Sequence, residues 1–437
     1  MHTHRRLATA LSVISLGLGQ IYNRQYMKGL LLLLIEVVGL NYFISNLNHA
    51  IWGLVTLGKT PTHFETINGV AKTVKGDHSI FLMLGGLITL LLLFLFAAVY
   101  VMNIKDAYLT GKKRDQGQKP VSIGQSIRYV MDKRFPEIFL SIPIIGVLFV
   151  TILPIIFTVL IAFTNYSGPD NLPPAKVLKW VGFRTFHDLI MFKTWSYTFF
   201  HILEWTIIWA IVATFTTYMG GVLVALLVNQ KGIRLKGMWR TIFIIPYAIP
   251  QLVSLLVMKN MFNGQFGPIN QYLGYFGLSK LPWLTDPTMA KITVIIVNMW
   301  VGIPVSMILI MGVLTAIPKD LYEAAEVDGA SAFLKFRLIT MPFILFTTAP
   351  LLIIQFAGNI NNFNVIFLLT KGDPVNGKFQ YGGSTDLLVT WLYKLTLDQQ
   401  KYNIAAAVGI IIFFMIASLS IWSYRKTRSF KEEDMIQ

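Results

Sequence analysis

Cysteine is absent from the 437 residues of this chain, which excludes disulfide bonds, thiolate nucleophiles and thiolate metal sites together. Charge is scarce as well, because Asp, Glu, Lys and Arg make up 13% of the residues, against roughly 25% in typical soluble domains. Hydrophobic residues make up 54%, and the mean hydropathy is +0.60. A water-soluble protein of this length needs more charge to cover its surface. The composition therefore disfavours a cytosolic enzyme and indicates a polytopic membrane protein.

Groups of residues that carry chemistry are also missing. The seven histidines are scattered, and none has a helical metal-binding spacing beside carboxylates. Neither a Ser/His/Asp arrangement nor a pair of carboxylates for acid–base work can be identified. We therefore expect no catalytic residue, no metal site and no cofactor, in a protein that is not itself an enzyme.

Eight stretches are long and apolar enough to cross a bilayer as helices. A spanning helix needs about 20 apolar residues, because the hydrocarbon core is about 30 Å thick and a helix rises about 1.5 Å per residue. These stretches are Gly29–Leu47, Ile80–Asn103, Glu137–Phe163, Glu204–Val228, Thr241–Phe262, Ile292–Ala316, Phe343–Leu369 and Ile404–Tyr424. Alternation with a period of two residues is absent, which argues against an outer-membrane barrel. The expected fold class is an all-α polytopic membrane protein with about eight transmembrane helices.

The N-terminus holds a shorter apolar segment, Leu7–Ile21, which is interrupted by Gly17, Gly19 and Gln20. We predict that it forms an interfacial or re-entrant helix, and it lacks the small-x-small site of a cleaved signal peptide. Glu36 falls within the first span, where an acid is a functional candidate by default. For Glu36 a structural partner or a lateral contact with another subunit is favoured over a functional role.

The distribution of basic residues predicts the orientation. The net charge is +16, which by itself would also suit a nucleic-acid partner. With the N-terminus inside, the cytoplasmic connections hold 23 of the 37 Lys and Arg residues and the longer outer loops hold 13. Because cytoplasmic loops carry the excess of Lys and Arg, both termini are expected in the cytoplasm of a multi-pass protein of the cell membrane. The positive charge then needs no nucleic acid to explain it.

A polar, basic linker, Lys105–Arg134, separates the first two spans from the other six. Residues 1–136 are therefore expected to form an N-terminal part with the interfacial segment, two accessory helices and the linker. Residues 137–424 would form a six-span core whose cytoplasmic loop is 317–342, and residues 425–437 a cytoplasmic tail. The chain shows no convincing internal repeat, which weakens the alternative of an ion-coupled secondary transporter.

The loop between the sixth and seventh spans has the sequence of a short helix–turn–helix. Pro318 is placed to start a helix, Gly329 to turn the chain and Ser331 to cap a second helix. Small side chains in such a helix would let the backbone of another protein come close. A free carboxylate would offer a charge with which that protein could pair. An ordinary amphipathic linker helix is the alternative. The residues concerned are Glu323, Ala324, Ala325, Asp328 and Gly329.

This loop resembles the signature of ABC-importer permeases, which is E-A-A, three residues, G, nine residues and I-x-L-P. The matching residues are Glu323-Ala324-Ala325, Gly329, Ile339 and Pro342, with Met341 in place of Leu. Further similarity to the larger (MalF-type) permease of the maltose/maltodextrin importer lies at Trp300–Pro304, Ile245–Pro250, Asn359–Phe363 and Leu368–Thr370. The resemblance covers roughly residues 137–424. Because the outer loop 164–203 is far shorter than in the enteric form, the chain is most similar to the Gram-positive branch.

The resemblance implies a permease subunit that conducts an oligosaccharide, most simply maltose or maltodextrin, without doing chemistry. It further implies a second permease, two ATPase subunits that hydrolyse ATP, and an extracellular lipid-anchored sugar-binding protein, in a bacterial cell membrane. Residues Glu323 to Gly329 would dock in a cleft of an ATPase subunit. An ion-coupled secondary sugar transporter is the alternative function.

Three amides form a polar stripe in the seventh span. Gln355, Asn359 and Asn362 are spaced i, i+4 and i+7, which places them on one face of a helix. Buried amides are costly without partners, so they face other helices or a wet cavity rather than lipid. Hydrogen bonds between helices and contacts with sugar hydroxyls are the two interpretations. The resemblance implies sugar contacts at Asn359, Asn362 and, where the family has a serine, Gln355, with further contacts at Gly358, Gly302 and Val305, the last in place of a tyrosine.

Residues Gly53–Thr60 match the phosphate-binding pattern G-x-x-x-x-G-K-[ST] letter by letter. That pattern cradles phosphate only between a strand and a helix of an ATPase core. Here it follows a spanning helix and falls in an outer loop, so we expect no nucleotide site.

Overall fold

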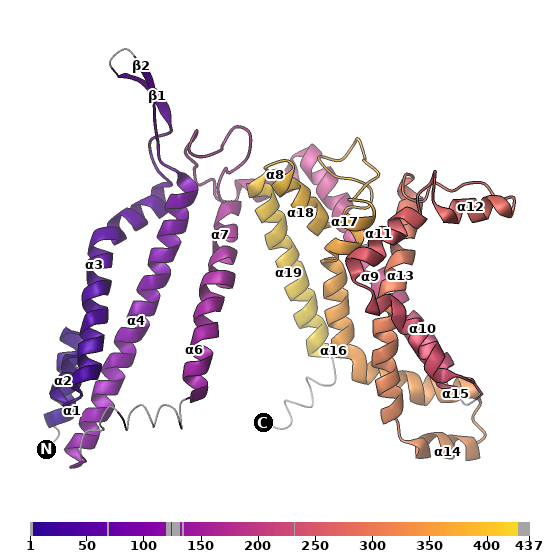
Figure 1. Cartoon of the computed structure of the whole chain (residues 1–437), viewed down its shortest axis with the longest axis horizontal. Coiled ribbons are helices and arrows are strands. Elements are labelled where there is room, and N and C mark those ends of the chain that lie inside the picture. Colours follow the sequence, from indigo (N-terminus) through magenta and orange to yellow (C-terminus); the bar gives the residue numbers. More distant parts are fainter. Residues whose placement is uncertain are drawn as a thin grey trace. The chain divides into compact units, whose positions relative to one another are not determined.

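The computed structural model of the chain describes residues 3–67, 70–118, 135–230 and 232–426, together with residues 124 and 132. The chain divides into two compact units, Met1–Gly182 and Phe183–Gln437. Within the described residues the fold is helical apart from one two-stranded sheet (Figure 1).

The first unit is built on two long helices, α3 (Tyr26–Thr56) and α4 (Ser79–Asp115), which pack against each other. They contain the first two expected spans. The helix α1 (Thr3–Ile14) and the short α2 (Leu18–Tyr22) lie against the same pair. Because α4 continues to Asp115, the beginning of the expected linker is helical rather than irregular. Most of the remaining linker lies outside the described residues.

A β-hairpin connects α3 to α4 and projects beyond their ends (Figure 1). It consists of β1 (His63–Ile67) and β2 (Val70–Val74), which are antiparallel, with Phe64 opposite Thr73. Below it, Asp77 accepts hydrogen bonds from the backbone N–H groups of Lys59 at 2.7 Å and Thr60 at 3.0 Å. These donors lower the pKa of Asp77 below its ordinary value. The phosphate-binding pattern Gly53–Thr60 therefore begins inside α3, and the N–H groups of its last two residues donate to the carboxylate of Asp77 rather than being free for a phosphate.

The third expected span is a continuous helical segment made of α6 (Phe135–Val147), the π-helical turn η1 (Leu148–Ile152) and α7 (Leu153–Ala162). Pro154 lacks the N–H that would bond the carbonyl four residues earlier. The helix widens into the π turn just before this proline.

The second unit is organised around α9 (Lys193–Asn229) and α13 (Pro287–Ala316), with α16 (Met341–Ile360) and α19 (Tyr402–Lys426) beside them. A Cβ atom on Gly302 of α13 would lie 2.6 Å from the Cγ2 atom of Thr217 of α9. Glycine therefore permits this close approach of the two helices. The other elements of the unit are α8 (Arg184–Met191), α12 (Pro268–Tyr275), α14 (Lys319–Val327), α15 (Ala332–Lys335), the π turn η2 (Phe336–Thr340) and α18 (Leu388–Leu397).

Two expected spans of the second unit are broken. The fifth consists of α10 (Lys236–Ala248) and α11 (Gln251–Met261), which are bent by 93° at the intervening Pro250. The seventh consists of α16 and α17 (Phe363–Leu369), which are separated at Asn361 and Asn362. Pro304 and Pro350, by contrast, lie within α13 and α16 without ending them.

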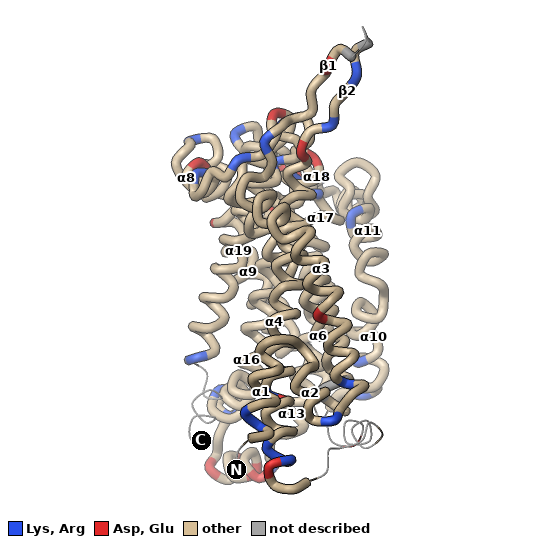
Figure 2. Tube along the Cα trace, turned by 90° about the vertical axis from the view of Figure 1, so that its left-hand side faces the viewer, with Lys and Arg blue, Asp and Glu red and all other residues tan. Residues whose placement is uncertain are grey.

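Among the described residues, seven helices are long and apolar enough to cross a membrane, or eight when the bent pair counts as one span. Each corresponds to one of the eight expected stretches, which confirms the all-α polytopic fold. Segment 7–21 is not one of them, because the left-handed residue Gly17 (φ 84°) separates α1 from α2. Most charged residues lie near the ends of the long helices, and few interrupt the stretches between them (Figure 2).

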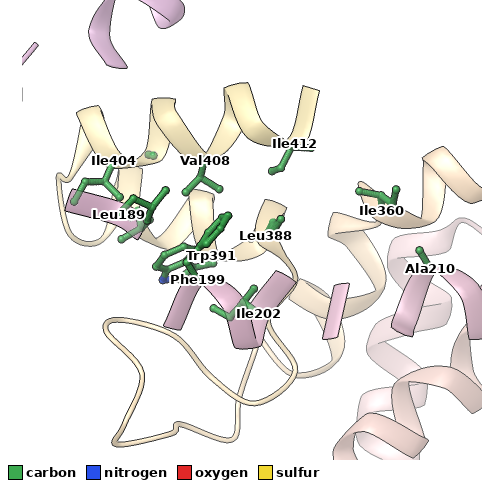
Figure 3. Packing of buried hydrophobic residues seen from close by; sticks show 12 residues of the cluster. Leu189, Phe199, Ile202, Ala210, Ile360, Leu388, Trp391, Ile404, Val408 and Ile412 are labelled. Carbon is green, nitrogen blue, oxygen red and sulfur yellow. The ribbon is translucent and has the colours of Figure 1, made fainter. Parts of the chain in front are cut away.

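The core of the second unit contains several clusters of buried apolar side chains. One is centred on Trp391 of α18, which is fully buried among residues of α8, α9 and α19 (Figure 3). A second joins Trp209 of α9 to Val297 of α13 and Val365 of α17. These clusters hold the break of the seventh span against α9 and α13, and so position the polar residues at that break.

Candidate functional site

The predicted amide stripe meets polar residues of α9. Gln355 donates from Nε2 to the Oγ1 atom of Thr217 at 2.8 Å, and Asn359 donates from Nδ2 to the Oγ1 atom of Thr214 at 2.9 Å. The backbone carbonyl of Asn359 accepts a bond of 3.0 Å from the indole N–H of Trp209. Asn359 is buried and Gln355 is half-buried. A layer of amides and hydroxyls thus lies between α9 and α16.

Asn362 is not a residue of a continuous helix, as its i+7 spacing from Gln355 predicted. It is the N-cap of α17, where its Oδ1 atom accepts from the backbone N–H of Val365 at 3.3 Å. Asparagine side chains compete with helical hydrogen bonds and favour caps, which explains the break at this position. From this place its Nδ2 atom donates to Asn298 of α13 at 3.1 Å and to Asn359 at 3.4 Å. The three predicted amides therefore remain neighbours.

The other three predicted contact residues lie in different surroundings. A Cβ atom on Gly358 would meet nothing within 4 Å, so the backbone of α16 is open there. The side chain of Val305 is 49% exposed on α13. Gly302 packs closely against Thr217 of α9.

The geometry shows the hydrogen bonds between helices, and the sugar contacts stay a prediction. Their N–H groups bond across helices, as the packing interpretation requires, while the open backbone at Gly358 leaves room beside them. The partners that complete the layer are Thr214, Thr217, Trp209 and Asn298, none of which the sequence analysis identified. The i, i+3 spacing of the two threonines on one face of a long apolar helix was the available signal.

The predicted helix–turn–helix is present between α13 and α16. Pro318 precedes α14, Gly329 turns the chain with a φ of 74°, and the Ser331 hydroxyl accepts from the N–H of Leu334 at 3.3 Å. The hydroxyl of Tyr322 lies 2.8 Å from that of Thr340. This contact ties α14 to the π turn at the start of the seventh span.

The helix α14 presents an uncovered face. None of its residues is buried, and Val327 is 88% exposed. Glu326 forms an ion pair of 2.8 Å with Lys335, whereas the described residues give Glu323 neither a hydrogen bond nor an ion pair. An exposed helix with small residues, an apolar tip and a free carboxylate suits a contact with another protein.

Glu36 has a structural partner within its own chain, which is one of the two roles favoured from the sequence. Its carboxylate accepts from the hydroxyl of Ser15 and, at 3.1 Å, from the backbone N–H of Leu16. It therefore satisfies the backbone where α1 ends inside the first unit.

Comparison with known proteins identifies the family. Residues 218–427 match the family described as binding-protein-dependent transport system inner membrane component. The chain is 39% identical to the galactooligosaccharides transport system permease protein GanP of Bacillus subtilis over 432 residues, which cover 98% of this chain and 99% of that protein. It is 37% identical to the maltodextrin transport system permease protein MalC of Streptococcus pneumoniae, over 98% of this chain and 97% of that protein.

The fold has a counterpart among solved structures. A chain of the crystal structure of a bacterial ABC transporter that imports the acidic polysaccharide alginate superimposes with a TM-score of 0.58 at 23% identity. The match covers 69% of this chain and 98% of that one. The near full-length relatives are permeases of the kind that the loop between α13 and α16 resembles. The alternative of an ion-coupled secondary transporter is therefore set aside. The chain belongs to the family of binding-protein-dependent ABC importer permeases, and is a membrane-embedded transport subunit rather than an enzyme.

Proposed function

We propose that this chain forms, together with a second permease, the path of an ABC importer for neutral oligosaccharides, with maltodextrin or maltose as its substrate. The observation that carries the proposal is the near full-length similarity to permeases named for maltodextrin and galactooligosaccharide transport. The amide layer at the break of the seventh span supports it, because amides both donate and accept hydrogen bonds, as sugar hydroxyls do.

A galactooligosaccharide is the second candidate substrate. The relative named for it is 39% identical to this chain, against 37% for the maltodextrin permease. Both substrates are uncharged chains of hexoses, so the same polar layer suits either.

The residues of the path are proposed as follows. Asn359, Asn362 and Gln355 would contact sugar hydroxyls when the helices separate around the substrate. The space beside these amides would be lined by residues without a polar side chain, namely Gly358, Gly302 and Val305. Glu323, Ala324, Ala325, Asp328 and Gly329 would form the contact with an ATPase subunit.

The surroundings of the chain follow from the same proposal. Two ATPase subunits, a lipid-anchored extracellular binding protein and the second permease would complete the importer in a Gram-positive cell membrane, with both termini of this chain cytoplasmic. Residues 137–424 would be the transporting part and 1–136 an accessory part, although the α6–α7 span lies in the first compact unit.

The experiment is affinity purification of the tagged chain from its own cells, followed by transport measurement. ATPase and second-permease subunits should co-purify. After reconstitution with the binding protein, a malto-oligosaccharide should stimulate ATP hydrolysis more than a galacto-oligosaccharide does. The reverse order would transfer the substrate to the second candidate, and stimulation by neither sugar would refute the proposal.

A further inference from the structure

A cavity lined by both polar and apolar side chains lies in the second unit, apart from the amide layer. It has a volume of about 470 Å³ and is bounded by α9 between His201 and Ile208, by the first residues of α13 and by the loop 375–386. Along α9, Glu204 precedes Thr214 by ten residues, which corresponds to about 15 Å at about 1.5 Å per residue. The cavity is therefore roughly three helical turns from the amide layer on the same helix.

Opposite charges line this cavity. Glu204 of α9 and Lys291 of α13 both border it, and the Nζ atom of Lys291 lies 4.5 Å from the ring centroid of Trp205. Neither a hydrogen bond nor an ion pair to Glu204 occurs among the residues that the structure describes. Glu204 is the first residue of its expected span and Lys291 directly precedes the next one, so the cavity lies at the ends of these two spans.

The chemistry of the lining favours an uncharged ligand with many hydroxyls. A carboxylate and an ammonium together disfavour a purely anionic or cationic ligand, because one of the two repels it. They offer an acceptor and donors, to which Asn376 and Ser384 add an amide and a hydroxyl. Apolar side chains of Ile208 and Phe379 complete the wall, and such surfaces pack against the C–H faces of a sugar ring.

The loop that closes the cavity is fixed from within. Asp386, which is fully buried, accepts from the N–H of Gly383 at 2.7 Å, from the Thr390 hydroxyl at 2.8 Å and from Lys394 at 2.7 Å. The carbonyl of Thr385 accepts from the indole N–H of Trp205 at 3.2 Å. The wall is thus held against α9 before any ligand arrives, which reduces the entropy lost on binding.

We propose that this cavity is a second oligosaccharide site, which holds one end of a longer chain while sugar units occupy the amide layer. The inference rests on the proposed function, since it takes the transported sugar as its ligand. Glu204 and Lys291 would form hydrogen bonds with hydroxyls of the oligosaccharide, and the ring of Trp205 would hold the ammonium group of Lys291 in place. The site would therefore make the importer prefer longer oligosaccharides over a disaccharide.

The test uses the complete importer in proteoliposomes, with the binding protein supplied outside. Uptake of a disaccharide and of a pentasaccharide of the same linkage would be measured for the wild type, Glu204→Gln and Lys291→Met. Matched controls are Glu65→Gln in the hairpin of the first unit and Lys378→Met, which does not line the cavity. Loss of one or two hydrogen bonds, each worth about 0.5–1.5 kcal/mol, should weaken the apparent affinity for the pentasaccharide about 2- to 150-fold. The disaccharide should be taken up as before.

A pentasaccharide with a photoreactive group provides a direct readout. Irradiation should label peptides that contain residues 201–208 or 375–384, and excess unlabelled pentasaccharide should prevent the labelling. Equal loss for both sugar lengths, which a docking surface for the binding protein would cause, would overturn the inference, and so would unchanged uptake without labelling. If the wild-type importer transports neither sugar, the proposed function itself fails.

Discussion

The two compact units of this chain bury very different shares of their apolar helices. In α9 and α13, 44% and 39% of the residues in the most apolar stretch are buried within the chain. In α3 and in the span Phe139–Ala162 the share is 6%. Lipid tails are as apolar as a leucine side chain, so an apolar helix can face lipid without packing against other parts of the protein. The difference teaches that hydropathy marks spans in both units, whereas burial distinguishes α9 and α13, the helices against which the amides pack. The span Ala332–Leu369, which carries the amides, is 17% buried, as is α4 of the first unit.

Polar contacts hold the first unit together where packing is sparse. Asn103 of α4 donates to the carbonyl of Ser12 at 3.2 Å and accepts from the N–H of Gly17 at 3.2 Å. Gln20 donates from the same Nε2 atom to the carbonyl of Asn103 and to Asp106. These bonds fasten the α1–α2 turn to α4. Such bonds satisfy backbone groups that a re-entrant turn would otherwise leave without partners inside a membrane.

The largest effect is expected from Glu323→Lys in the second unit. Charge reversal on the uncovered face of α14 should prevent docking of an ATPase subunit, so uptake should fall to background while the protein stays in the membrane. Co-purification of the ATPase and sugar-stimulated ATP hydrolysis check this. Glu326→Gln is the control, because Glu326 pairs with Lys335 of its own chain and its loss should leave most uptake. Normal coupling in Glu323→Lys would contradict the assignment of this helix.

A smaller loss is expected from Asn359→Ala in the amide layer. One or two hydrogen bonds to sugar, each worth about 0.5–1.5 kcal/mol, correspond to about a 2- to 150-fold change in apparent affinity or rate. Basal ATP hydrolysis should persist. Asn361→Ala, an exposed asparagine two residues away, is the matched control. If the amides only join helices, the Asn359 variant should instead lose subunits in detergent at unchanged sugar preference.

In the first unit, Asn103→Ala should destabilise the fold locally without abolishing transport. Asn103 is 3% exposed, and its loss removes two hydrogen bonds and leaves backbone partners unpaired, at a cost of about 1–3 kcal/mol. The segment α1–α2 should then be cut faster by added protease, with uptake reduced about twofold at most. Asn46→Ala, whose side chain donates to the carbonyl of Tyr42 in its own helix, should change neither quantity. Complete loss of uptake would break the functional contrast between the units.

The smallest effect concerns Asp77 at the base of the hairpin. Its pKa is lowered by the N–H groups of Lys59 and Thr60, so its stabilisation of this loop is present above its ordinary value of 3.8 and is lost as the pH falls through the lower, folded value. The protection of these two amides against hydrogen exchange, relative to the rate of an unstructured peptide at the same pH, should therefore fall only below about pH 4 in the wild type. In Asp77→Asn this protection should already be lower at neutral pH. Glu65→Gln should leave the exchange of both amides unchanged.

Hydrophobic length determined the spans, because any segment of about 20 apolar residues is driven out of water whatever its neighbours are. All eight were predictable from sequence, whereas the sharp bend of the fifth was not, because Pro304 and Pro350 lie within α13 and α16 without ending them. The turn at Gly329 and the cap at Ser331 were predictable, because each depends on local sequence. The extension of α4 to Asp115 was missed, because basic residues suggest a linker as readily as a solvated helix end.

Tertiary structure alone decided the partners of the predicted residues. The i+7 spacing of Asn362 concealed its place as a cap, and nothing local to Asn359 identifies Thr214 or Trp209, which lie about 150 residues earlier in the chain. That Glu204 and Lys291 border the same cavity is likewise not evident from either segment taken alone. Spans follow from transfer between water and lipid, a property of each segment by itself. A polar site depends on which helix faces come together, and that is set by packing between segments distant in the chain.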